Sequence, residues 1–235
     1  MNYEQKLSLA KYINFLPYLG AGYAQATPKI LILGHSHYAN CDGTPEQLAL
    51  WDGAPNRTRE VILDDYLGTL AASGGKTHPH SWVRCYRKMA TVLTGKPYHD
   101  SDYIWEQIAF SNFFQKHIGI SPNDRQFCTN ELLDLSRKAF FENLEILKPE
   151  YVVVWGSELV YYCLPQQGFI GITHNENPEG SPDELPWIGY YKDFPKIIFW
   201  WMKHPSAPSF SYNAEYENWK VVLELSKSYL LNGEI

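Results

Sequence analysis

The chain has 235 residues, of which 45 % are apolar and 20 % are charged. This composition is typical of a folded globular protein, and it excludes disordered, collagen-like and coiled-coil chains. The net charge of −6, from 26 acidic and 20 basic residues, argues against tight, sequence-indifferent binding to a phosphate backbone. We expect a single domain over residues 1–235, with a helical insertion at about residues 40–100.

Nothing in the sequence predicts export or a membrane anchor. The first residues lack a basic and apolar leader, and the longest apolar runs are too short to span a bilayer. The 4 cysteines are scattered and form no CxxC pair, which is typical of reduced thiols. We therefore expect a cytoplasmic protein that does not contact a membrane.

Short apolar runs alternate with helix-like spacings along the chain. Uninterrupted runs of this kind are typical of strands buried on both faces of a parallel sheet, and their alternation with helices predicts βαβ units. We therefore expect an α/β fold with three layers, α/β/α, and a central, mainly parallel four-stranded sheet. In chain order, the expected elements are a helix over 7–15, a strand over 30–33, helices over 57–70 and 82–93, a strand over 108–111, a helix over 129–147, strands over 151–155 and 197–201, and a helix over 216–230.

Ligands of open α/β sheets bind beyond the carboxyl ends of the strands. Four loops occupy such positions, and their side chains are mostly small or polar. These loops are the most informative places to look for chemistry. They cover residues 34–38, 112–114, 156–157 and 204–206.

The first of these loops reads Gly34-His35-Ser36-His37. A glycine at a strand end permits a sharp turn and exposes backbone N–H groups to a ligand. Two histidines around a serine could act as a base and a nucleophile, or as a pair of metal ligands. They could equally be structural, bonded only to neighbouring backbone.

Two further loops carry candidate side chains. His204 directly follows a predicted strand, and Pro205 stiffens its presentation and keeps it out of helical geometry. Asn112 emerges among aromatic residues, where its amide could read the edge of a planar heterocycle through a donor and an acceptor. An internal hydrogen-bonding role for the asparagine, or a simple turn at the histidine, is the alternative.

Taken in order, these motifs resemble the uracil-DNA glycosylase superfamily. Its best-known branch has a water-activating loop written Gly-Gln-Asp-Pro-Tyr-His, a middle strand that delivers an asparagine, a later strand ending in Trp-Gly, and a final His-Pro-Ser. The counterparts here are Gly34-His35-Ser36-His37-Tyr38-Ala39, then Asn112, then Trp155-Gly156, then His204-Pro205-Ser206. The resemblance covers about half of the chain.

The resemblance implies a DNA-repair hydrolase that flips a damaged base into a tight pocket. It implies that Asn112 reads the base, that Tyr38 rejects a thymine methyl group, and that His204 stabilises the departing base. Single-stranded DNA, damaged duplex DNA or a nucleobase would be the partner. The implied catalytic residues are His204, His35 and Ser36, and the implied substrate-binding residues are Gly34, His37, Tyr38, Asn112, Phe113 and Ser206.

One position departs from the pattern of the family. Ser36 stands where the best-known branch has its water-activating aspartate, and a serine alone is not a base at neutral pH. His35 or His37 could activate water instead, because an imidazole titrates near neutrality. Asp42 is the nearest carboxylate downstream. The family's duplex wedge has no clear match, although Ala207 and Phe210 lie in the corresponding loop.

Other functions remain open on the sequence alone. In an SGNH-type esterase, Ser36 would be the nucleophile and His204 its base, but Trp201 and His35 occupy positions where that family has acids. The same framework could also bind a nucleobase or nucleotide without any chemistry. A zinc site is a further alternative, at His35 and His37 with Cys41 or at His78 and His80.

No cofactor is expected, because the chain contains neither G-x-G-x-x-G nor a complete G-x-x-x-x-G-K-S/T motif: Leu70 stands where the first glycine before Gly75-Lys76-Thr77 would be needed. The proposed insertion is locally basic. It could form a lid that binds a nucleic-acid strand, or merely a solvated helical face. Its basic residues are Arg57, Arg59, Lys76, Arg84, Arg87, Lys88 and Lys96.

Overall fold

The computed structural model describes residues 1–39, 44–74, 83–120, 128–173 and 185–232. Its centre is a mixed sheet of seven strands, in the order β1-β3-β2-β4-β7-β6-β5. The inner strands β3, β2, β4 and β7 are parallel, whereas β1, β6 and β5 join the edges in antiparallel fashion. The strands are β1 Tyr18–Leu19, β2 Ile30–Gly34, β3 Ala109–Asn112, β4 Tyr151–Trp155, β5 Phe169–Gly171, β6 Trp187–Tyr191 and β7 Ile198–Met202.

The α/β class and the parallel centre confirm the expectation, but the expected number of strands was wrong. All four predicted strands are present, and they form the four parallel members of the sheet. The three additional strands lie at or near the edges, where strands are short and only partly buried. β1 has 2 residues and β5 has 3, too few to give a recognisable period.

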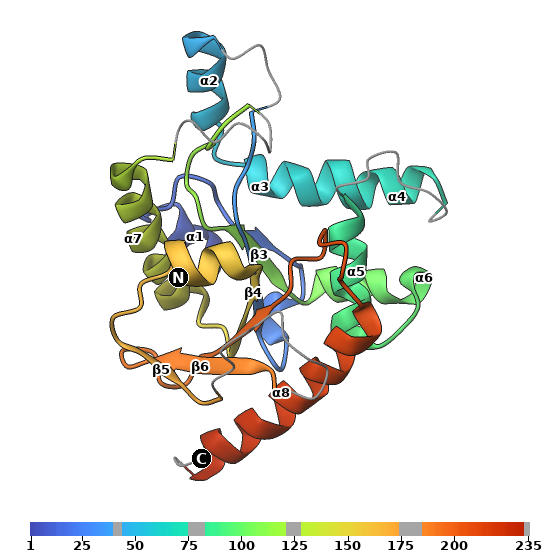
Figure 1. Ribbon diagram of the computed structural model, residues 1–235. Helices are drawn as coiled ribbons and strands as arrows, with labels where there is room; N and C mark the ends of the chain where they lie inside the picture. Colours follow the sequence, from blue (N-terminus) through green and yellow to red (C-terminus); the bar gives the residue numbers. More distant parts are fainter. Residues whose placement is uncertain (40–43, 75–82, 121–127, 174–184, 233–235) are drawn as a thin grey trace.

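Helices surround this sheet (Figure 1). The predicted helix over 129–147 is confirmed as α7, and the Thr129 hydroxyl accepts the Leu132 N–H at 3.2 Å as its N-cap. The helices are α1 Tyr3–Leu7, α2 Pro45–Asp52, α3 Arg57–Glu60, α4 Thr69–Ala72, α5 Arg84–Thr94, α6 Tyr98–Ser101, α7 Asn130–Leu147 and α8 Tyr212–Asn232, with the 3-10 segments η1 Tyr23–Gln25 and η4 Asp102–Glu106 and the π-helical segments η2 Val61–Gly68 and η5 Leu159–Cys163.

The helix expected over 7–15 was wrong for most of its length, because helix α1 ends at Leu7. The reason lies in α7, which is more than 100 residues further along the chain. The carboxylate of Glu142 accepts the backbone N–H groups of Lys11 and Tyr12, both at 2.7 Å, and that of Ile13 at 3.2 Å. Charge-assisted bonds to this carboxylate replace the bonds that a helix would make.

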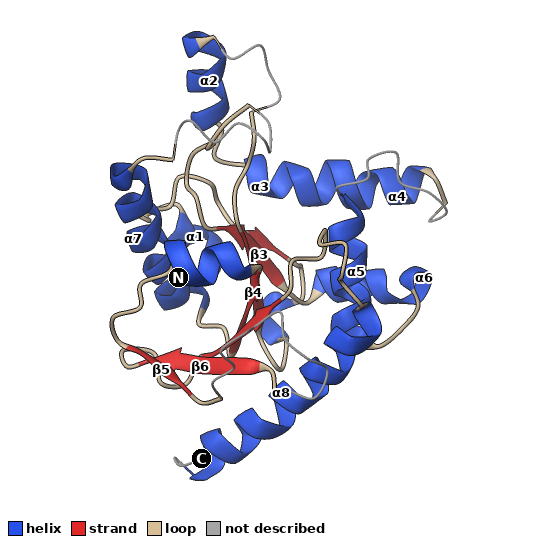
Figure 2. Cartoon of the chain, viewed as in Figure 1, coloured by secondary structure: helices blue, strands red, loops and turns tan. Residues whose placement is uncertain are grey.

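Apolar residues cover both faces of the sheet. Leu31 and Leu33 of β2 belong to a core shared with α1 and α7, whereas Ile30 and Ile32 belong to a second core shared with α5 and α8. Successive side chains of a strand point to opposite faces, so an uninterrupted apolar run is what a sheet buried on both faces requires. Figure 2 shows the sheet between these helices.

The segment expected as an insertion contributes to the second core. Met89, Ala90 and Val92 of α5 are completely buried, and α5 packs against α8. By contrast, α2 has no buried residue and stands apart at the top of Figure 1. No helix within the described ranges combines the length and the apolar character needed to cross a bilayer.

Candidate functional site

A cavity of about 870 Å³ opens at the carboxyl ends of the parallel strands. This volume falls within the roughly 300–1,000 Å³ that is usual for small-molecule sites. All four loops singled out in the sequence contribute to it. Its lining residues are Gly34, His35, Ser36, His37, Tyr38, Trp51, Val61, Asp65, Cys85, Tyr86, Phe110, Asn112, Ile120, Trp155, Gly156, Ser157, Glu158, His204 and Ser206.

His35 links a hydroxyl to a carboxylate in this cavity. Its Nδ1 lies 2.9 Å from the Ser36 hydroxyl, and its Nε2 lies 3.5 Å from Oε1 of Glu158. The ring of Phe114 packs edge-on against the imidazole, with centroids 5.1 Å apart. A carboxylate next to one ring nitrogen can accept that nitrogen's proton in a hydrogen bond, which orients the ring and leaves the other nitrogen as an acceptor. The arrangement can therefore accept a proton from water or from Ser36.

His37 is less suited to proton transfer. Its imidazole is buried, and Nε2 lies 2.9 Å from the Thr58 hydroxyl. Burial, followed by the nearby Arg57 guanidinium, lowers the pKa of His37 to about 3. Such an imidazole stays neutral and is a very weak base at neutral pH. Of the two histidines considered as water activators, His35 has the better environment.

Asn112 is positioned by its strand and by a glycine opposite. β2 and β3 run in parallel with Gly34 beside Asn112, and a Cβ at residue 34 would collide with Oδ1 of Asn112 and approach Cζ of Phe110 to 2.9 Å. The asparagine is 5 % exposed. Its side-chain amide makes no hydrogen bond within the described ranges, although it lines the cavity. A buried amide without a protein partner is suited to a polar ligand.

His204 is held in one tautomer. The backbone N–H of Ser206 donates to Nδ1 of His204 at 3.1 Å, and the Ser206 hydroxyl lies 2.7 Å from the same nitrogen. Because Nδ1 accepts, we assign the proton of the neutral ring to Nε2. Burial, followed by the charge of His35 and Lys88, lowers the pKa of His204 to about 4. At neutral pH it is a hydrogen-bond donor without a positive charge.

Gly156 makes this placement of His204 possible. Its φ is +89°, a conformation that costs other residues roughly 1–2 kcal/mol. A Cβ at residue 156 would lie 3.2 Å from Cβ of His204. The Trp-Gly motif therefore has a physical role, because its glycine turns the chain after β4 and leaves space for the histidine.

An aromatic cluster forms one wall of the cavity. Tyr86 of α5, Phe110 of β3 and Trp155 of β4 are packed against one another with ring centroids 5.4 to 5.7 Å apart. Tyr38 and Trp51 add two further rings to the lining. Such a wall can hold a planar heterocycle by stacking.

Not every residue inferred from the sequence reaches this cavity. Phe113, expected to bind substrate, is 1 % exposed and packs in the core against Phe114 and Phe140, with centroids 5.2 and 6.4 Å away. Conversely, the sequence reasoning missed Glu158 and Asp65, the two carboxylates of the lining. Glu158 comes two residues after the Trp-Gly motif, and this position is the one local hint in the sequence that it belongs to the site.

The structure bears on the esterase and zinc-site alternatives in different ways. Ser36 contacts His35, whereas Nδ1 of His204 is bonded to Ser206, so each serine has its own imidazole. Within the part of the chain that the structure describes, no three His, Cys, Asp or Glu side chains are grouped closely enough to hold a metal ion. Cys41, Asp42, His78 and His80 lie outside the described residues.

Several basic residues of the proposed lid are already engaged with acids. Arg57 pairs with Glu60 at 3.0 Å and Arg87 with Asp102 at 3.2 Å. Arg59 likewise contacts the carboxylate of Glu4, at 2.9 Å. These pairs favour a structural role for the segment over a lid that binds a nucleic-acid strand. Lys76 lies outside the described residues.

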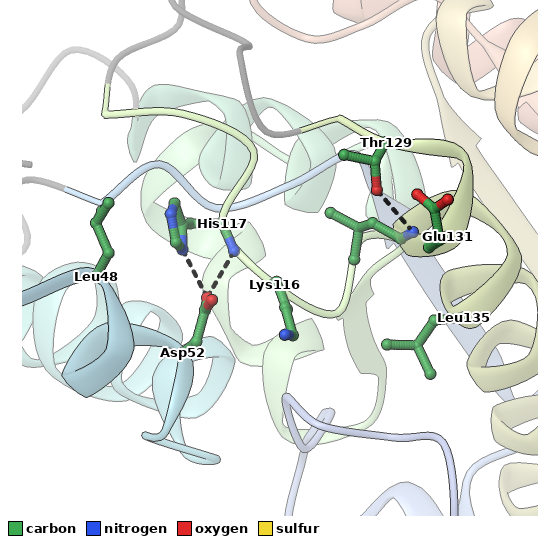
Figure 3. Close-up of a pocket in the computed structure, with 8 residues that line it drawn as sticks. Leu48, Asp52, Lys116, His117, Thr129, Glu131 and Leu135 are labelled. Carbon is green, nitrogen blue, oxygen red and sulfur yellow. Dashed lines mark hydrogen bonds and ion pairs between the residues drawn. The ribbon is translucent and has the colours of Figure 1, made fainter. Parts of the chain in front are cut away.

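A second, smaller cavity of about 390 Å³ lies between α2 and the start of α7. Figure 3 shows its main contact, between Asp52 and His117. The carboxylate of Asp52 accepts a hydrogen bond from the backbone N–H of His117 at 3.0 Å, and the same carboxylate lies 2.6 Å from Nδ1 of the His117 ring. The backbone N–H and the ring Nδ1 of His117 thus both have a hydrogen-bond partner within the protein. This contact ties the end of α2 to the chain after β3, and it assigns the histidine a structural role.

No family model and no curated protein matches the chain. The geometry of the larger cavity is therefore the basis for a functional assignment.

Proposed function

We propose that the protein binds a nucleobase flipped out of DNA and hydrolyses its N-glycosidic bond, as a uracil-DNA glycosylase-like protein. The observation that carries this proposal is the convergence of His35, Asn112 and His204 on one cavity. These side chains come from three places far apart in sequence, each at or just beyond the carboxyl end of a parallel strand. The parallel sheet centre with helices on both faces also agrees with the three-layer fold that the motifs implied.

Recognition of the base rests on Asn112 and the aromatic wall. The amide offers both a donor and an acceptor, which can pair with adjacent polar atoms on a base edge. The rings of Tyr86 and Trp155 offer flat apolar faces to the heterocycle. When a flipped base forms hydrogen bonds with the buried amide, these bonds offset part of the free energy that is lost when the base leaves the stack.

His204 acts on the leaving group. When the N-glycosidic bond of a neutral base breaks, negative charge develops on the base. The Nε2–H of neutral His204 can donate to an oxygen or nitrogen that carries this charge, and the donor is already oriented by Ser206. Preorganisation of this kind is worth about 10²–10³-fold in rate for a single donor.

We assign the activation of the attacking water to His35. Its Nδ1 faces the Ser36 hydroxyl, and Glu158 lies beside the opposite nitrogen. A water that displaces Ser36 from Nδ1, or bonds to both groups, can give its proton to the imidazole. Glu158 is a positioning residue in this scheme, because it acts on the reaction through His35.

The decisive assay uses single-stranded and duplex oligonucleotides with one uracil, one hypoxanthine or one methylated base at a fixed position. Base release leaves an abasic site, which alkali cleaves. We expect His204→Ala to lower the rate by about 10²-fold or more, and Asn112→Ala to abolish binding of the base. Asn213→Ala, on the exposed start of α8, is the matched control and should leave the rate unchanged.

Three outcomes separate the alternatives. Cleavage that depends on His204 supports the proposal. Binding of the damaged oligonucleotide through Asn112, without any abasic site, identifies a non-catalytic binding module and overturns the hydrolytic part. Neither cleavage nor binding with any of the bases rejects the assignment entirely.

Ester hydrolysis is a second candidate, because Ser36, His35 and Glu158 form a continuous hydroxyl, imidazole and carboxylate chain. In this reaction Ser36 would attack the acyl carbon and His35 would take its proton. Turnover of an activated acyl ester that disappears in Ser36→Ala, but persists in Asn112→Ala, would favour this function over base excision.

A further inference from the structure

Lys88 connects helix α5 to the loop that carries His204. Its ammonium group donates to the backbone carbonyl of Pro205 at 2.6 Å and lies 5.1 Å from the ring centroid of Phe210. Both contacts are in the loop between β7 and α8, and Pro205 is buried. The hydrogen bond therefore holds a positive charge beside the backbone that directly follows His204.

The positive charge of Lys88 has no acidic partner in the part of the chain that the structure describes. Its contacts are a carbonyl and an aromatic ring, and neither carries a charge. By contrast, Arg59 and Arg87 of the same segment are paired with the carboxylates of Glu4 and Asp102. The Lys88 side chain is also partly buried, so solvent screens its charge less than that of an exposed lysine.

The charge of Lys88 acts on His204. Burial, then the charge of His35 and then that of Lys88 lower the pKa of His204, whereas Glu158 raises it with the smallest effect of the four. A positive charge that makes it harder to protonate a ring also makes it easier to place a negative charge beside that ring. Lys88 therefore favours an anion bound to the Nε2–H of His204.

The proposed reaction creates such an anion. The oxygen of a water molecule bonds to C1′ of the sugar, the C1′–N bond breaks, and its electron pair stays with the base, which becomes negatively charged. The proton of the water passes to His35 and then to solvent, from which the base later takes a proton. His204 is neutral and offers this base only a hydrogen bond. No lysine or arginine belongs to the lining formed by the described residues, so a permanent positive charge has to come from beyond the lining.

Building on the proposed function, we infer that Lys88, held by the Pro205 carbonyl, is a positioning residue whose charge stabilises the anion of the base on His204. Lys88 does not line the cavity, so it acts through the loop of His204 and through its electric field. Its contribution depends on the charge of the bound base, whereas a purely structural contribution would be the same for every base of similar shape. This difference makes the role testable.

Uracil and barbiturate test this role without any chemistry. Barbiturate is uracil with one added oxygen, and it is an anion at neutral pH, whereas uracil is neutral. In a titration of the tryptophan fluorescence, we expect Lys88→Met to weaken the binding of barbiturate about tenfold and to leave that of uracil nearly unchanged. Methionine keeps an apolar chain against Phe210. Lys88→Arg retains the charge and should retain most of the binding of barbiturate.

Lys96→Met is the matched control. Lys96 is an exposed lysine of the same segment, and its ammonium group lies 4.7 Å from the ring centroid of Tyr103. The control therefore removes the same charge and the same kind of ring contact, at a site outside the cavity. It should change the binding of neither ligand.

Release of uracil and of 5-fluorouracil from one oligonucleotide sequence completes the test. The fluorine withdraws electrons, so 5-fluorouracil leaves as a more stable anion and depends less on stabilisation by the protein. In the alkali-cleavage assay, Lys88→Met should slow the release of uracil about tenfold and that of 5-fluorouracil by several-fold less.

The outcomes separate this inference from the proposed function. If Lys88→Met weakens both ligands equally, or slows the release of both bases equally, the inference is overturned and the proposed function stays in place. Binding of barbiturate that depends on Lys88, without release of any base, supports the inference and overturns the hydrolytic part of the proposed function. If neither ligand binds and no base is released, the inference and the proposed function fail together.

Discussion

Acid should destabilise this protein well before its carboxylates are protonated, because two histidines are held neutral by burial. Burial lowers the pKa of His37 to about 3 and that of His204 to about 4, from an ordinary value of 6.5. In the unfolded chain both imidazoles regain that ordinary value. Protons therefore bind the unfolded state preferentially as the pH falls below 6.5, and the free energy of unfolding decreases.

The size of the effect follows from the two pKa values of each histidine. Below an unfolded pKa of 6.5, each pH unit removes about 1.4 kcal/mol of stability until the folded pKa is reached. Between about pH 7 and pH 5, His37 should therefore remove about 2 kcal/mol. His204 is less completely enclosed, so its share is at most similar. Several kcal/mol is a large part of the stability of a domain of this size.

Urea unfolding, followed by tryptophan fluorescence at the two pH values, measures this loss. In His37→Gln the amide can still bond to the Thr58 hydroxyl but cannot take up a proton in this range, so the acid-induced loss should shrink by about 2 kcal/mol. A variant with both histidines changed to glutamine should be nearly insensitive to this pH step. An undiminished loss in His37→Gln would refute the assignment of the acid sensitivity to this buried imidazole.

Three further substitutions test the geometry of the site and fold. Gly34→Ala should displace the Asn112 side chain and abolish base binding in the fluorescence titration. It should also lower the free energy of unfolding by about 1–3 kcal/mol, because the added Cβ crowds the buried ring of Phe110. Gly156→Ala should lower the free energy of unfolding by about 1–2 kcal/mol and reduce base release by displacing His204, measured by urea unfolding and by the alkali-cleavage assay. Glu142→Ala leaves three N–H groups of the N-terminal segment without their acceptor and should cost about 2–3 kcal/mol in urea unfolding without altering base binding.

The parts of the site that follow apolar strands could be predicted from the sequence. Parallel strands end at one edge of a sheet, so Asn112 and His204 had to lie near one another once their strands were recognised. The positions of individual side chains were harder to predict. Asn112 and Phe113 are consecutive, and consecutive side chains near a strand end point in opposite directions. Because Asn112 faces the cavity, Phe113 is directed into the core.

Other features depend on contacts between distant parts of the chain. Glu158 belongs to the site because the turn at Gly156 brings it to His35, and no local pattern encodes that distance. The end of α1 is likewise decided by Glu142, more than 120 residues away. A helical spacing cannot compete with a carboxylate that accepts three backbone N–H groups, but the sequence does not reveal where that carboxylate lies.

The distribution of charge indicates which part of a nucleic acid this protein would recognise. Phosphate contacts supply most of the affinity of ordinary DNA-binding proteins, yet the net charge here is −6. Arg57, Arg59 and Arg87 are engaged with acidic side chains, which reduces what the basic segment can offer to phosphates. The cavity, by contrast, combines stacking surfaces with the buried amide of Asn112. Under the proposed function, recognition would therefore come mainly from the base itself, and a flipped or already unpaired nucleotide would suit such a site better than an intact duplex.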